Sequence, residues 1–146
     1  MESRKSNYFE VKVSYIKAYE RGTVKRVTEV YAVDAMSFTE ADSRITTEFQ
    51  SYFDLEIKAI TRAAYAEVIT DCDINANGRY YKAKVAYATF DEKGKEHRAI
   101  VTYLVQAGSL DDAKGNLDVY ISNSMVDWEK VSVAETKVLD VFFHKA

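Results

Sequence analysis

The chain has 146 residues, of which 47% are apolar and 29% are charged, and its net charge is −3. This length is typical of one domain and is enough to bury a substantial core. The charge balance gives no support for a reader of duplex DNA, which usually has a basic domain. Because no apolar run approaches eighteen residues and no apolar signal region follows Met1, we expect a cytoplasmic protein.

The residues that build common catalytic and metal sites are scarce. Cys72 is the single cysteine, and His97 and His144 are the only histidines. A zinc site needs three or four clustered ligands, and the sequence has neither a phosphate-binding glycine loop nor a nucleophile elbow. We therefore expect a protein that is not an enzyme and that has no metal and no cofactor.

One short stretch resembles half of a calcium loop. Asp73-Ile74-Asn75-Ala76-Asn77-Gly78 places oxygen ligands at alternate positions and a glycine at the sixth. The twelfth position requires a bidentate glutamate, and Lys84 occupies it. A turn rich in Asn, Asp and Gly is the preferred interpretation.

The first half of the chain begins with strands. From Tyr8, apolar and polar residues alternate with the two-residue period of a half-buried strand. Residues 20–23 form a turn signal in which Gly22 can adopt a positive φ. A second strand is predicted over about residues 24–35, where valines and Tyr31 are frequent.

A helix and another strand follow. Ser37 and Glu40 have the spacing of a capping box. Apolar residues then recur with a helical period, at Phe38, Ala41, Ile45 and Phe49. Residues 54–69 return to a strand-like composition, and the irregular pattern at Ala63-Ala64 predicts a bulge or a bend.

The second half repeats this order after a linker at 71–78. It shows an alternating strand from Tyr80, a turn at Gly94, a strand over 97–105, a helix capped by Ser109 and a last strand over about 131–143. The apolar stripe of its helix is Leu110, Ala113, Leu117 and Ile121.

The two halves align directly. Residues 8–51 lie on residues 80–123 without a gap, and twelve of the forty-four positions are identical, whereas about three would match by chance at ~6–7% per position. The identical pairs are Tyr8/Tyr80, Lys12/Lys84, Val13/Val85, Tyr15/Tyr87, Glu20/Glu92, Gly22/Gly94, Arg26/Arg98, Tyr31/Tyr103, Val33/Val105, Ala35/Ala107, Ser37/Ser109 and Ala41/Ala113.

These features predict an α+β fold. We expect one domain over 1–146, built of two ββαβ repeats at about 8–70 and 80–143, with pseudo-twofold character. The repeats would form mostly antiparallel sheets of about six strands with two helices, because short turns join the strands. Tyr15 and Tyr87 share the apolar faces of their strands, so we expect core rings with hydroxyls at the rim.

Cations and aromatics on the strands suggest the candidate site. Most retained positions serve the fold, but Lys12/Lys84 and Arg26/Arg98 are retained pairs for which the sequence shows no structural need. A sheet face with cations and aromatic rings binds single-stranded nucleic acid, since cations meet phosphates and bases stack on rings. The predicted contacts are Lys12, Arg26, Lys58, Arg62, Lys82, Lys84 and Arg98 for phosphates, and Tyr8 or Tyr80 for stacking.

Other interpretations stay open. Charge on the outer face of a strand commonly serves only solubility and edge protection. A small ligand or nucleotide could bind in a tyrosine-lined pocket between the halves or between subunits of a homo-oligomer. A protein-interaction or structural subunit without a small ligand is the third alternative.

Four segments also carry a family resemblance. They are Asn7-Tyr8-Phe9-Glu10-Val11-Lys12-Val13, Thr28-Glu29-Val30-Tyr31-Ala32-Val33-Asp34-Ala35, Ser37-Phe38-Thr39-Glu40-Ala41 and Tyr81-Lys82-Ala83-Lys84-Val85. The chain resembles a small family of uncharacterised domains of Bacteroidetes and their phages and mobile elements. The resemblance implies an intracellular protein of unknown function, with no established site residues to carry over. Its setting suggests accessory roles in DNA metabolism, or sequestration of a nucleotide signal used in host defence.

Overall fold

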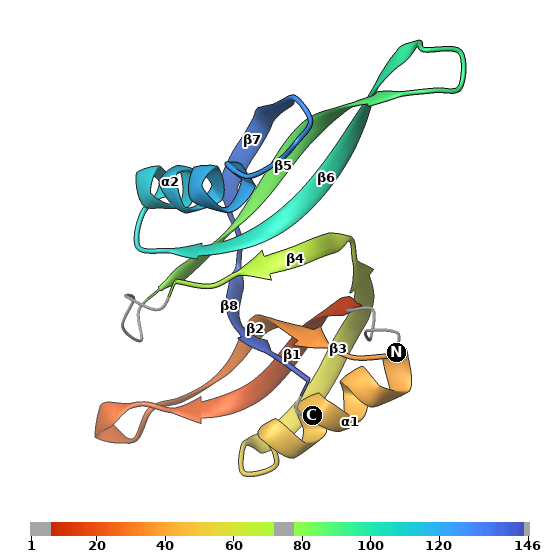
Figure 1. Cartoon of the computed structure of the whole chain (residues 1–146). Helices are drawn as coiled ribbons and strands as arrows, with labels where there is room; N and C mark the ends of the chain where they lie inside the picture. The colour runs from red at the N-terminus through yellow and green to blue at the C-terminus, as the bar shows by residue number, and fades with distance from the viewer. Residues whose placement is uncertain (1–6, 72–77, 145–146) are drawn as a thin grey trace. The chain divides into compact units, whose positions relative to one another are not determined.

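The computed structural model describes residues 7–71 and 78–144. Within them the chain forms two α-helices and eight strands, and the strands make two four-stranded sheets (Figure 1). Both sheets are mixed and mostly antiparallel. The prediction of an α+β protein with two helices is confirmed, but the expected strand number of about six is wrong. Cys72 and most of the calcium-like stretch, residues 73–77, lie outside the described residues.

The chain divides into two compact units. Unit 1 comprises the described residues of Met1–Ala64 and Lys137–Ala146, and unit 2 those of Tyr65–Thr136. Each unit holds one sheet and one α-helix. The chain therefore passes from one unit to the other twice, after Ala64 and after Thr136.

Unit 1 has the strand order β3-β1-β2-β8. The three longer strands pair antiparallel, whereas β8 runs parallel to β2. Helix α1 lies against one face of this sheet (Figure 1). The elements are β1 (Tyr8–Ala18), β2 (Val24–Asp34), α1 (Phe38–Glu48), β3 (Phe53–Ala63) and β8 (Val138–Phe142), with a 3-10 turn at Glu20–Gly22.

Unit 2 has the strand order β4-β6-β5-β7. Here β5 pairs antiparallel with both β6 and β7, and β4 runs parallel to β6. Helix α2 packs on this sheet, with contacts to all four strands. The elements are β4 (Tyr65–Ile69), β5 (Arg79–Phe90), β6 (Glu96–Ala107), α2 (Leu110–Ile121) and β7 (Trp128–Glu135).

Each helix seals one core with the apolar face of its sheet. Burial of these side chains supplies the main stabilising free energy, at ~25 cal/mol per Å² of apolar surface. The core of unit 1 contains Phe9, Val11, Val13, Val33, Ala35, Ala41, Ile45 and Phe49. The core of unit 2 contains Tyr81, Ala83, Val85, Tyr103, Val105, Ala107, Ala113, Leu117 and Ile121. Every core position of unit 1 therefore has a counterpart in unit 2 at an offset of 72.

The helix stripes are confirmed except at their first residues. Ile45 and Leu117 are fully buried, but Phe38 is 47% exposed and Leu110 is 42% exposed. Both exposed residues stand in the first turn, directly after the capping serine. The Phe38 ring still makes an edge contact with Phe9, with 4.8 Å between centroids.

Two predicted strands are each broken into two. The strand expected over 54–69 ends at Ala63 and resumes at Tyr65, and the two parts pair in different sheets. The strand expected over 131–143 is divided in the same way by residues 136 and 137. Alternation of side chains shows that a segment is extended, but it does not show which neighbour the segment pairs with.

The β1–β2 and β5–β6 turns use the expected glycines. Gly22 has φ +76° and Gly94 has φ +79°. A Cβ atom is strained in this left-handed region, so glycine is favoured at both turns. The positive φ predicted for Gly22 is confirmed.

Neither α1 nor α2 can cross a membrane. The two helices have 11 and 12 residues, and a span through a bilayer needs about 20 apolar residues. Within 7–71 and 78–144, no helix is both long enough and apolar enough to be a membrane span.

Candidate functional site

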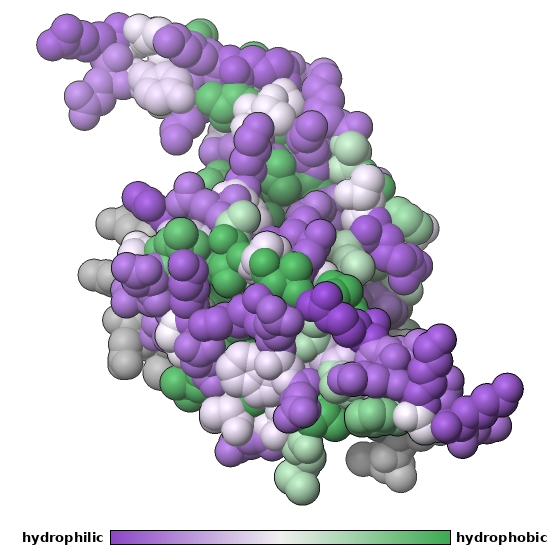
Figure 2. Space-filling model, turned by 90° about the horizontal axis from the view of Figure 1, so that it is seen from above, coloured by the Kyte–Doolittle hydropathy of each residue, from purple (hydrophilic) through white to green (hydrophobic). Residues whose placement is uncertain are grey.

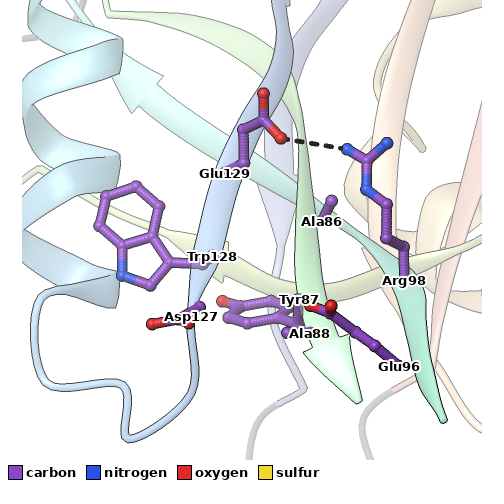
Figure 3. A pocket seen from close by; sticks show the side chains of 8 residues that line it. All are labelled: Ala86, Tyr87, Ala88, Glu96, Arg98, Asp127, Trp128 and Glu129. Atoms are coloured by element: carbon purple, nitrogen blue, oxygen red, sulfur yellow. Dashed lines mark hydrogen bonds and ion pairs between the residues drawn. The ribbon is translucent and has the colours of Figure 1, made fainter. Parts of the chain in front are cut away.

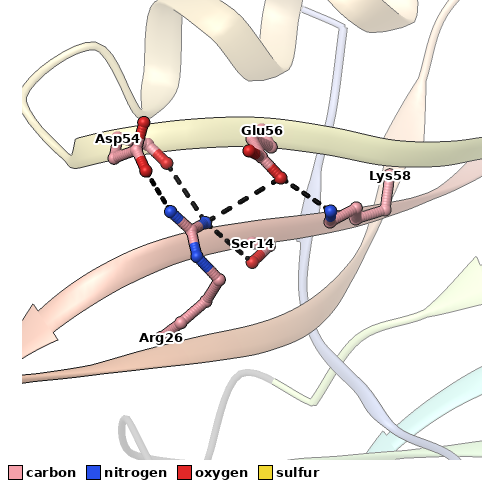
Figure 4. A network of polar contacts seen from close by, with 5 residues as sticks. All are labelled: Ser14, Arg26, Asp54, Glu56 and Lys58. Atoms are coloured by element: carbon pink, nitrogen blue, oxygen red, sulfur yellow. Dashed lines mark hydrogen bonds and ion pairs between the residues drawn. The ribbon is translucent and has the colours of Figure 1, made fainter.

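In unit 1, a polar network lies on the sheet face opposite α1 (Figure 4). Side chains alternate along β1, so Val11 and Val13 face α1 while Lys12 and Ser14 face the other way. Arg26 of β2 reaches across β1 on this second face. Its Nη1 donates to Ser14 Oγ at 3.0 Å.

Carboxylates of β3 complete this network. The Arg26 guanidinium forms an ion pair with Asp54 and lies 4.0 Å from Glu56 Oε2. Lys58 Nζ lies 2.6 Å from the same Glu56 oxygen. The hydrogen bond and charge of Lys58, and then the charge of Arg26, lower the pKa of Glu56. Two cations and two carboxylates thus neutralise one another.

Unit 2 has a simpler ion pair at the corresponding place. Glu129 stands beside Ala86 in the sheet, as Glu56 stands beside Ser14, and residues 14 and 86 are 72 apart. Arg98 Nη2 lies 3.4 Å from Glu129 Oε2. In each unit the retained arginine therefore reaches across one strand to a carboxylate on the next: from β2 across β1 to β3 in unit 1, and from β6 across β5 to β7 in unit 2. The interpretation that the Arg26/Arg98 pair has no structural need is wrong.

Lys12 and Lys84 differ from the arginines. Both are exposed, and they lie at corresponding positions of the central strands β1 and β5. Lys84 is flanked by Thr102 and Ser132. Neither lysine has an ion pair with any residue that the structure describes. These two side chains are open to an external anion.

The other two predicted cations contact aromatic rings. The Arg62 guanidinium lies 5.2 Å from the ring centroid of Phe9 and 5.8 Å from that of Phe38, on the α1 side of the sheet. Lys82 Nζ lies 5.8 Å from the centroid of Tyr65. Such contacts contribute ~0.5–1 kcal/mol at exposed sites.

The seven cations therefore do not lie on one face of a single sheet. Arg62 lies on the opposite face of its sheet from Lys12 and Arg26. The remaining six lie on the faces opposite the helices, but they are divided between two sheets, as Lys12, Arg26 and Lys58 in unit 1 and Lys82, Lys84 and Arg98 in unit 2. On the side of the molecule shown in Figure 2, hydrophobic and hydrophilic residues are interspersed.

The predicted stacking rings are covered. Tyr8 is 2% exposed and Tyr80 is 4% exposed. A base stacks only on a ring face that solvent can reach, so the prediction that bases stack on Tyr8 or Tyr80 is wrong. A position at a strand end suggests exposure, and the burial of both rings contradicts that expectation. Phe53 and Phe90 are the exposed rings on the same faces, at 71% and 68%.

Retained tyrosines form hydrogen-bonded pairs at the rims of the cores. In unit 1, Tyr15 and Tyr31 donate to Glu29 Oε1 at 2.8 and 2.9 Å. In unit 2, the hydroxyls of Tyr87 and Tyr103 are 2.8 Å apart. Burial, and then these hydrogen bonds, raise the pKa of Tyr15, Tyr31 and Tyr103. The expectation of core rings with rim hydroxyls is confirmed for Tyr15, which is 6% exposed.

A shallow pocket of about 280 Å³ lies on unit 2 (Figure 3). Ala86 and Ala88 of β5 lie between the charged lining residues of β6 on one side and those of β7 and the residue before it on the other. The lining is completed by Tyr87, Glu96, Arg98, Asp127, Trp128 and Glu129. Sequence reasoning missed this pocket and the carboxylates of β3 and β7. Their shared spacing, Asp54/Glu56 and Asp127/Glu129, was the available signal.

The described segments contain no cluster of His, Cys, Asp and Glu side chains that could hold a metal ion. His97 Nε2 instead lies 3.0 Å from Asp91 Oδ2 in the β5–β6 turn. His144 Nδ1 lies 3.4 Å from Glu40 Oε1 beside α1. These contacts link His97 to its own turn and the segment after β8 to α1.

The fold and the polar faces define a class: an α+β protein with two mixed sheets, each packed on one helix and each carrying charged side chains on its other face. A family model covers residues 7–145, and the chain belongs to that family, the domain of unknown function DUF4494. No curated protein matches the chain.

Proposed function

We propose that this protein is a non-enzymatic binding protein whose ligand is single-stranded nucleic acid. The observation that carries the proposal is the matched pair Lys12 and Lys84. Each is exposed at the middle of a central strand, on the face opposite the helix, and has no ion-pair partner among the residues described. Free lysines are suited to phosphates, which need a positive charge but little directional geometry.

The remaining cations divide into supporting roles in this proposal. Arg26, Lys58 and Arg98 hold carboxylates and act on phosphates only by adding to the local charge. Bases stack on Phe53 and Phe90, which are exposed on the same faces as the lysines. Stacking on exposed rings is tolerant of sequence, so little base preference is expected.

Fluorescence anisotropy with labelled single strands tests this function. The wild-type protein should bind at low salt and lose affinity as salt rises, because phosphate contacts release counterions. The double variant Lys12→Glu/Lys84→Glu should lose at least tenfold in affinity and show a shallower salt slope. Lys114→Glu on α2, which makes half of that charge change, is the single-site control. Absence of low-salt binding by the wild type, or an equal loss in the control, contradicts the proposal.

The proposal also includes a cellular role for the protein. The resemblance to domains of Bacteroidetes, their phages and mobile elements supports an accessory role in DNA metabolism inside the cell. In this proposal the protein acts as a homo-oligomer. A nucleotide-sequestering protein is less well supported, because three carboxylates and one arginine line the pocket of unit 2. A structural or protein-interaction subunit remains the alternative if the anisotropy experiment finds no binding.

A further inference from the structure

The polar network of unit 1 has an incomplete counterpart in unit 2. Asp54 and Glu56 correspond to Asp127 and Glu129, which are also two residues apart, with Asp127 directly before β7 and Glu129 within it. Both edge strands also contain a bulge at the same place. Lys58 is the extra residue between the partners of Lys12 and Val13, and Val131 is the extra residue between the partners of Lys84 and Val85.

At the bulge, the polar network of unit 1 contains an ammonium group that unit 2 lacks. In unit 1, Lys58 places its Nζ 2.6 Å from Glu56. In unit 2, Val131 occupies the equivalent bulge and supplies no charge. Arg98 is the one cation in the pocket lining, against Glu96, Asp127 and Glu129. Glu96 and Asp127 have no ion-pair partner in the described parts of the chain.

The space for a ligand is present as well. Where unit 1 has Ser14 and Ile16 on its central strand, unit 2 has Ala86 and Ala88, and the shorter side chains leave the pocket of about 280 Å³. In Figure 3, Arg98 and Glu129 lie on opposite sides of Ala86. A cavity with an alanine floor and carboxylate walls is suited to an apolar stem with a cationic head.

We propose that this pocket of unit 2 binds an alkylammonium group, which takes the place that Lys58 fills in unit 1. The ammonium donates to Glu129 and its neighbouring carboxylates, and a short methylene stem lies over Ala86 and Ala88. A phosphate is disfavoured by the surplus of carboxylates. The group comes from a free amine or polyamine, or from a lysine side chain of another protein. Because the lining is exposed, a single group should bind with a Kd on the order of 1 mM.

NMR titration of the full chain with n-butylammonium tests the site. The methyl signals of Ala86 and Ala88 should shift and saturate, whereas neutral n-pentanol at equal concentration should leave them unchanged. Val131→Lys should abolish the shifts, because it restores the arrangement of Lys58. Val119→Lys, the same change on the exposed surface of α2, should leave binding intact.

Two further measurements sharpen the result. Lys58→Val alone should create no binding site in unit 1, so the signals of Ser14 should stay unchanged, because Ser14 and Ile16 fill the space that Ala86 and Ala88 leave open in unit 2. Spermidine and Nα-acetyl-lysine amide then distinguish the sources: tighter binding of the first indicates a free polyamine, and tighter binding of the second indicates a lysine of a partner. The proposal is overturned if no amine shifts Ala86 and Ala88, if pentanol shifts them equally, or if Val131→Lys binds like the wild type.

Discussion

At the scale of single residues, the contacts of Arg26 and Arg98 across their sheets explain why an arginine occurs at both positions. Arg26 satisfies Ser14, which is only 1% exposed, and also pairs with Asp54. Arg98 makes one longer contact, to Glu129. The two arginines occupy equivalent positions of the repeat but differ in the number of contacts, so their contributions to stability should differ.

Arg26→Gln should lower the free energy of unfolding by ~1–2 kcal/mol, because a buried hydroxyl loses its donor and two carboxylates lose a cation. Arg98→Gln should cost only ~0.5 kcal/mol, as an exposed ion pair does. Urea denaturation measures both. Arg79→Gln serves as the control, since Arg79 pairs with Glu135 at a similarly exposed position. Equal losses for Arg26 and Arg98 would contradict this account.

The rim tyrosines should make the protein sensitive to base. Burial and the bonds to Glu29 raise the pKa of Tyr15 and Tyr31 in the folded state. The unfolded chain then loses these protons first, from about pH 10. Their contribution to stability is complete below that pH and is lost as the pH rises toward the folded pKa.

Melting temperatures between pH 8 and 11.5 test this dependence. The Tm of Tyr31→Phe should start lower, because Glu29 loses one donor, but should fall less steeply above pH 10 than the Tm of the wild type. Tyr19→Phe, at a ring that is 43% exposed, should keep the wild-type slope. A Tyr31→Phe curve parallel to the wild type would refute the assignment.

At the scale of elements, the helix starts were readable from the sequence because capping is local. Ser37 Oγ accepts from the backbone N–H of Glu40 at 3.1 Å, and Ser109 Oγ accepts from Asp112 in the same way. Glu40 Oε2 accepts from the N–H of Met36, one residue before the cap. The reciprocal bond of a standard capping box is thus shifted by one position.

Ser37→Ala and Ser109→Ala should each destabilise the protein by ~1 kcal/mol, because the first turn of a helix loses a partner for an orphan N–H. Ser43→Ala is the control, since Ser43 is exposed inside α1 and alanine is the better helix former there. Thermal melts compare the three variants. A loss for Ser43→Ala as large as for Ser37→Ala would argue against capping as the cause.

The strands show the limit of local patterns. The pattern at Ala63-Ala64 predicted a bulge or bend, and the structure has a complete break, after which β4 joins the sheet of unit 2. Both β4 and β8 have five residues and pair in parallel with one neighbour. Parallel pairing joins segments distant in the sequence, so no short turn announces it. The sequence therefore suggested six strands.

At the scale of the whole molecule, unit 2 is a continuous segment, Tyr65–Thr136, inserted in the chain between two parts of unit 1. Unit 1 takes β8 after β7, and unit 2 takes β4 after β3. Both ends of unit 2 lead within one or two residues into strands of the sheet of unit 1. We therefore expect the two units to unfold as one cooperative transition.

Ile45→Ala and Leu117→Ala test this coupling as a matched pair, since both side chains are fully buried in the helix stripe of their unit. Each should cost ~2–5 kcal/mol. Differential scanning calorimetry should show one peak in both variants, at a lower temperature than in the wild type. Two resolved peaks, with only one displaced by each variant, would show that the units unfold independently.

The sequence by itself determined the local features of this protein: the alternating strands, the turn glycines, both helix caps and the residues that fill the two cores. These follow from periodicity and from hydrogen bonds within a few residues. Only the tertiary structure decided that β4 pairs in a different sheet from β3, and β8 in a different sheet from β7. It also decided that Arg26 and Arg98 contact carboxylates of β3 and β7, and that Tyr8 and Tyr80 are buried. Each of these depends on which strands become neighbours, and pairing between distant segments leaves no mark on the local pattern.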